Sequence, residues 1–185
     1  RTERRPLPPE KNKFLHKILT DKEFVVTNTE LAKLNYNVIE NQQTIILNEI
    51  KEIPQALATT LASFYSKGGS VIVIPSEETN VQNINSFLKN FGSLQFAPIN
   101  KTEKQITKIS FNHPLYKNVF EKKITNFQYP KVNQYFPSSG KGLPILQLED
   151  QANFAFSVNN TLGNLYVFTA PLNKQNTNFQ NCRSG

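Results

Sequence analysis

The chain has 185 residues, of which 38% are hydrophobic and 19% are charged. These values are typical of a globular domain, and the length favours one domain, so a disordered chain is not expected. The net charge is +7, but Lys and Arg are scattered along the sequence, which favours a solvated basic surface over a nucleic-acid-binding one. The single cysteine, Cys182, excludes an internal disulfide framework and a paired-cysteine metal site.

The organisation of the chain is predicted from its ends and its apolar pattern. The first residue is Arg1 and Met is absent, which indicates a fragment of a longer protein. Residues 1–13 are rich in Arg, Pro and Lys and are expected to be a linker or a cloning remnant. Residues 14–180 are predicted to form a single α/β domain, and residues 181–185 form a tail. No stretch approaches the roughly 20 apolar residues that cross a bilayer, so the domain is expected to be soluble.

The first elements are short. Apolar residues at helical spacing predict an amphipathic helix at 14–19, and the apolar run at 24–26 predicts a strand. Thr29 is expected to cap a brief helical turn that carries Leu31 and Leu34. The compact apolar run at 44–48 is typical of a buried strand.

A clear alternation follows. Pro54 begins a helix that ends at the glycine pair 68–69, and residues 70–74 form a second apolar strand. Residues 80–91 carry apolar side chains at helical intervals. This strand and helix rhythm predicts parallel pairing in a flavodoxin-like, doubly wound α/β sheet.

The second half is rich in strands. It is expected to extend the sheet or to lay an antiparallel ribbon at its edge. A short helix is expected at 113–120, and strands are expected at 106–111, 124–129, 144–148, 154–158 and 165–169.

Candidate site residues follow the two apolar strands, because a parallel α/β sheet binds its ligands at the carboxyl ends of its strands. Asn48 and Glu49 follow the first strand, and Ser76 and Glu77 follow the second. Ser76 lacks the flanking glycines of a nucleophile elbow. The carboxylates could bind a cation or act as acid and base, although Glu77 is also well placed to favour the dipole of the next helix.

Two histidines complete the search. His113 could act as a base or could cap the turn into a short helix, and His16 is expected to be exposed among lysines. The sequence predicts no catalytic residue, no metal site and no cofactor. If a ligand binds, the expected rim consists of Asn48, Glu49, Ser76, Glu77 and His113.

Several motifs resemble one known family, over roughly residues 13–180. The motifs are ILNEIKEIP at 46–54, FYSKGGSVIVIPS at 64–76, FGSL at 91–94, NHPL at 112–115, VFEKK at 119–123, NFQYP at 126–130 and YVFTAPL at 166–172. The chain resembles the class I glutamine amidotransferase-like domain of BatA-type membrane proteins, the aerotolerance regulators of Bacteroidetes. Such proteins also carry membrane helices and a von Willebrand factor A-like domain.

The resemblance implies a setting and a role. It implies a domain of a bacterial inner-membrane protein, on the periplasmic side, that binds protein partners and touches the membrane only through parts outside this chain. True amidotransferases present a nucleophilic cysteine in the turn where this chain has Pro75 and Ser76, so glutaminase activity is expected to be absent. The family pattern begins with an apolar strand where this chain has residues 1–13, so the first strand is expected to be missing.

Two functions therefore remain open from the sequence. The first is a non-catalytic interaction or structural module. The second is a small-ligand-binding or hydrolase-like domain that uses the rim defined above. An open cleft that joins the rim residues would favour the second function, and a filled rim would favour the first.

Overall fold

The computed structural model describes residues 15, 19, 24–110, 112–114 and 129–178. The chain divides into two compact units, Arg1–Asn35 and Tyr36–Gly185. The predicted domain of residues 14–180 includes parts of both units, whereas residues 1–13 and 181–185 lie outside the described residues.

The described part of the first unit is small. A 3-10 turn, η2, spans Leu31–Lys33, and Lys33 forms an ion pair of 2.7 Å with Glu30. The predicted turn is therefore confirmed, but the residue before it is Glu30 and not Thr29. The predicted strand at 24–26 is wrong, because these residues have no regular secondary structure and Val25 is fully exposed. Most of the predicted helix at 14–19 lies outside the described residues.

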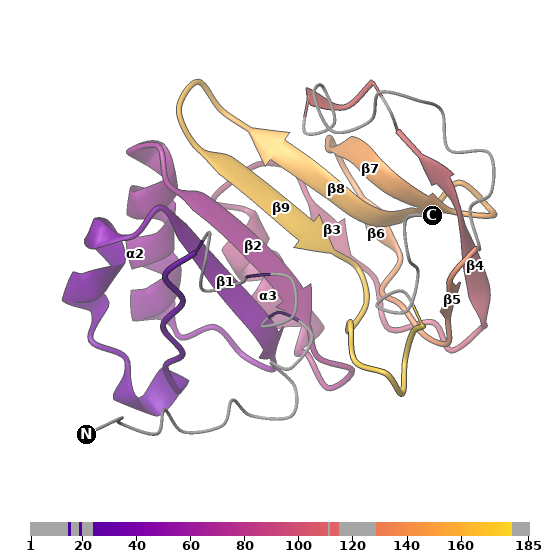
Figure 1. The fold of residues 1–185 in the computed structure, drawn as a ribbon, viewed down its shortest axis with the longest axis horizontal. Helices are drawn as coiled ribbons and strands as arrows, with labels where there is room; N and C mark the ends of the chain where they lie inside the picture. The colour runs from indigo at the N-terminus through magenta and orange to yellow at the C-terminus, as the bar shows by residue number, and fades with distance from the viewer. Residues whose placement is uncertain (1–14, 16–18, 20–23, 111, 115–128, 179–185) are drawn as a thin grey trace. The chain divides into compact units, whose positions relative to one another are not determined.

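The second unit is built on a sheet of seven strands in the order β1-β2-β9-β8-β7-β4-β5 (Figure 1). β1, β2 and β9 are parallel, and the other neighbouring pairs are antiparallel. The fold is therefore mixed α/β, and the strand-rich second half extends the sheet as predicted. The strands are β1 (Thr44–Ile50), β2 (Ser70–Pro75), β4 (Lys104–Ile109), β5 (Lys131–Val132), β7 (Leu143–Leu148), β8 (Asn153–Asn159) and β9 (Asn164–Phe168).

The first half follows the predicted alternation. Helix α2 (Gln55–Ser66) begins directly after Pro54, whose fixed φ suits the start of a helix. Helix α3 (Val81–Leu88) is capped by Asn80, whose side chain accepts a hydrogen bond from the backbone N–H of Asn83 at 3.0 Å. The 3-10 helix η3 (Tyr36–Asn41) precedes β1 and was not predicted.

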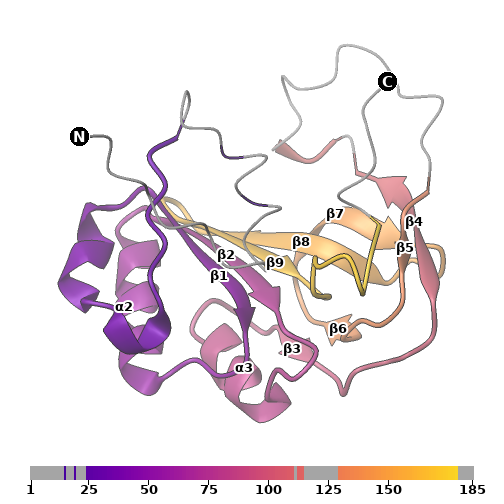
Figure 2. The same ribbon diagram turned by 60° about the horizontal axis from the view of Figure 1, so that its bottom comes forward.

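The core lies between the sheet and the two helices. α2 and α3 cover the same face of the sheet (Figure 2). Val71, Val73, Leu165 and Val167 alternate along β2 and β9 and are 0% exposed, as expected for side chains on the covered face. A doubly wound sheet has helices on both faces, and no helix of the described residues of this unit covers the opposite face.

A small second sheet closes the side of this core. β3 (Gln95–Phe96) pairs antiparallel with β6 (Ser138–Ser139). The rings of Phe96 and Phe136 stack with centroids 5.5 Å apart. Neither of these strands, nor β5, was predicted, because two residues are too few to show an alternating pattern. The strand expected at 124–129 and the helix expected at 113–120 lie almost entirely outside the described residues.

Candidate functional site

The carboxyl ends of β1, β2 and β9 meet at one edge of the sheet, which we call the carboxyl edge. Glu49 lies near the end of β1, and Ser76 and Glu77 directly follow β2. The parallel pairing of β1 with β2 places Ile50 beside Pro75. The structure therefore brings these predicted residues to one edge, as the rule for parallel strands requires.

Glu49 is displaced from the ladder. The register of β1 and β2 shifts between Asn48 and Ile50, and Glu49 has φ of 51°. A residue with a side chain rarely adopts this left-handed conformation, which has a cost of order 1 kcal/mol. The carboxylate accepts a hydrogen bond of 2.9 Å from Nδ2 of Asn173, in the loop after β9.

Ser76 shapes the turn after β2. Its hydroxyl oxygen accepts a hydrogen bond from the N–H of Glu78 at 3.2 Å, and its own N–H donates to Oγ1 of Thr79 at 2.8 Å. Thr79 Oγ1 in turn donates to the carbonyl of Ile50 at 2.7 Å, which ties this turn to the end of β1. Ser76 is only 9% exposed. These contacts are those of a turn residue and not of a nucleophile beside a base.

Amide side chains form hydrogen bonds with the two acidic residues of this edge. Nε2 of Gln134 donates to Oε2 of Glu77 at 2.6 Å. Asn176 is 3% exposed, and its Oδ1 accepts from the N–H of Gln134 while its Nδ2 donates to the carbonyls of Gln134 and Pro171, each at 3.0 Å. We call Gln134, Asn173 and Asn176 the amide network.

The amide network was missed by the sequence analysis. Gln134 and Asn176 are 42 residues apart in the sequence, and Asn173 and Asn176 follow the last strand. Contacts between such distant residues are not visible in a local sequence pattern. The structure explains why the Asn-rich stretch reaches this edge: β9 is parallel to β2, so the residues after β9 begin at the edge where β2 ends.

His113 lies apart from the carboxyl edge. Its Nε2 and the Oγ of Ser157 in β8 are 2.7 Å apart, and both residues are buried. Ser157 pairs with Tyr166, and Tyr166 pairs with Ile72. Because side chains alternate between the two faces along a strand, these three lie on the face opposite to the one that α2 and α3 cover. Burial lowers the pKa of His113 below its ordinary value.

The carboxylates at the carboxyl edge already have partners other than a metal cation. The carboxylates of Glu49 and Glu77 accept hydrogen bonds from the amide network, and Glu78 forms an ion pair with Lys51. Among the described residues, no three His, Cys, Asp or Glu side chains gather as metal ligands do. Asn48 lies on β1 beside Ile74.

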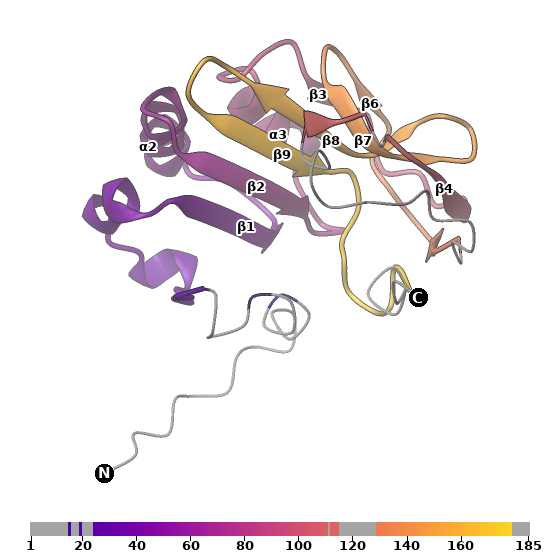
Figure 3. The ribbon, with the colours of Figure 1, turned by 45° about the horizontal axis from the view of Figure 1, so that its top comes forward.

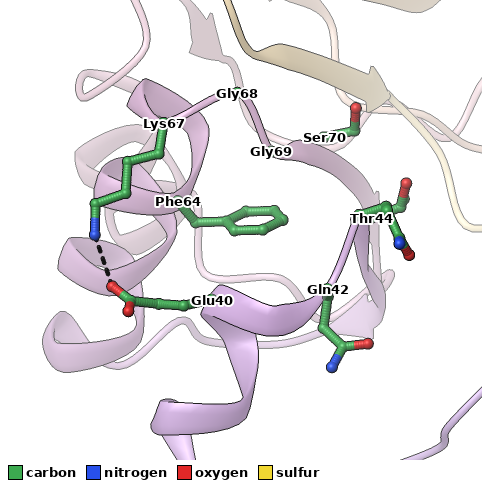
Figure 4. A pocket seen from close by; sticks show the side chains of 9 residues that line it. Glu40, Gln42, Thr44, Phe64, Lys67, Gly68, Gly69 and Ser70 are labelled. Atoms are coloured by element: carbon green, nitrogen blue, oxygen red, sulfur yellow. Dashed lines mark hydrogen bonds and ion pairs between the residues drawn. The ribbon is translucent and has the colours of Figure 1, made fainter.

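An open pocket lies at the opposite edge of the sheet, near the amino ends of β1 and β2 (Figure 4). It has a volume of about 540 Å³, and none of the predicted site residues line it. The ring of Phe64 points toward it, and Lys67 and Glu40 form an ion pair of 2.8 Å on its wall. The hydrogen bond and the positive charge of Lys67 lower the pKa of Glu40. The charged groups of this pocket therefore already satisfy each other.

In the part of the chain that the structure describes, no helix is both long enough and apolar enough to traverse a bilayer. Comparison of the sequence with models of protein families gave no match. Comparison with curated proteins also gave none.

Solved structures of similar fold were found. The cytoplasmic protein STM1381 from Salmonella typhimurium LT2 superposes with a TM-score of 0.57 at 11% identity, over 75% of this chain and 64% of that one. The cytoplasmic protein STM3548 from Salmonella typhimurium gives 0.56 at 11% identity, over 74% and 63%. The β-galactosidase from Rahnella sp. R3 gives 0.53 at 8% identity, over 74% of this chain and 21% of that one.

These comparisons bear on the fold alone, because the identities are low. They support a mixed α/β fold for this chain. The chain spans less than two thirds of the length of either Salmonella protein. It matches only about a fifth of the β-galactosidase, so the same fold also occurs as one part of a much longer chain.

Proposed function

We propose that this chain is a non-catalytic interaction or structural module of a larger, membrane-anchored bacterial protein. The observation that carries the proposal is the set of hydrogen bonds that already engages the acidic residues of the carboxyl edge. The amide network occupies the place where an α/β domain of this type would bind a substrate, and it cross-links Glu49 and Glu77. A site whose polar groups already satisfy one another offers little to a small ligand.

The arrangement of possible catalytic groups supports the same proposal. A hydrolase with a serine nucleophile needs a base within hydrogen-bonding reach of that serine. Ser76 bonds to its own turn, whereas His113 bonds to Ser157 on the far face of the sheet. The rival function needs the predicted rim to act as one site, and His113 does not join the other residues.

The family assignment belongs to the same proposal. We propose that the domain is related to the class I glutamine amidotransferase-like domain of BatA-type proteins and is flavodoxin-like in its winding. The parallel β1-α2-β2 unit supports this assignment. The turn at Pro75 and Ser76 contains no cysteine, which fits a family member that lacks glutaminase activity. The periplasmic side of the membrane and protein partners follow as expectations.

The experiment compares the full-length protein with a deletion of residues 36–178, each purified from native membranes and analysed by mass spectrometry. We expect at least one partner to be lost with the deletion and to be retained by Ser76→Ala and Glu77→Gln, which alter only the carboxyl edge. An identical partner list with and without the domain would refute an interaction role. Turnover of glutamine or of an ester that disappears in Ser76→Ala would instead establish the hydrolase-like function.

A further inference from the structure

We draw no further inference here: the strongest candidate, the outer edge of strand β1 at the end of the seven-stranded sheet (Figure 3), carries none, because nothing in the part of the chain that the structure describes shows what covers that edge.

Discussion

Replacing Asn176 by alanine tests whether the amide network holds the carboxyl edge together. The substitution removes three hydrogen bonds of 3.0 Å to Gln134 and Pro171 from a side chain that is 3% exposed. Each such bond contributes about 0.5–1.5 kcal/mol net, and a buried partner left unsatisfied costs about 1–3 kcal/mol. Gln134 is half-buried and can regain water, so we expect the free energy of unfolding to fall by about 2–4 kcal/mol.

The assay is urea denaturation followed by circular dichroism, with Gln175→Ala as the control. Gln175 is exposed, and only its main chain bonds to Asn173 and Asn133, so its substitution should change stability by less than about 0.5 kcal/mol. Asn176→Asp keeps the shape and the acceptor but loses both donors, so it should also destabilise the protein. If Asn176→Ala unfolds within about 0.5 kcal/mol of the control, the network does not stabilise this edge and our reasoning about a filled site fails.

Three further predictions concern the core and the pH dependence. Burial lowers the pKa of His113 in the folded state. As the pH falls below about 6.5, the unfolded chain therefore binds a proton at this histidine before the folded chain does. The free energy of unfolding should then fall by up to about 1.4 kcal/mol per pH unit, until the pH reaches the lower pKa of the folded state. Denaturation at several pH values should show a smaller loss in His113→Gln, and equal slopes in both proteins would contradict this assignment. Gly69→Ala should lower the free energy of unfolding by about 1–3 kcal/mol in urea or thermal denaturation, because the new Cβ would clash with the ring of Phe64. Adding Phe64→Leu to the same chain should recover part of that loss, and the absence of any recovery would exclude the clash as the cause. Phe87→Ala should cost about 3–5 kcal/mol in the same assay, because the ring is 2% exposed and packs 4.9 Å from Phe91, and a loss below about 1 kcal/mol would show that α3 is loosely packed.

The candidate site was predictable only where it depended on strand direction. Glu49, Ser76 and Glu77 lie at one edge because β1 and β2 are adjacent and parallel, and a short helical crossover favours both properties. The position of His113 was not predictable, since it depends on which face of the sheet its side chain contacts. That choice is made by β8 and its Ser157, which follow 44 residues later in the chain.

The local elements of this protein follow from patterns among neighbouring residues. Apolar runs, Pro54 and Asn80 place β1, α2, β2 and α3 because strand and helix periodicity and helix caps are properties of neighbouring residues. Three features depend instead on long-range contacts: α2 and α3 share one face, β9 lies between β2 and β8, and amide side chains hydrogen-bond to the acidic residues of the carboxyl edge. These outcomes depend on contacts between residues that are far apart in the chain, and a local sequence pattern does not show which of those contacts are favourable.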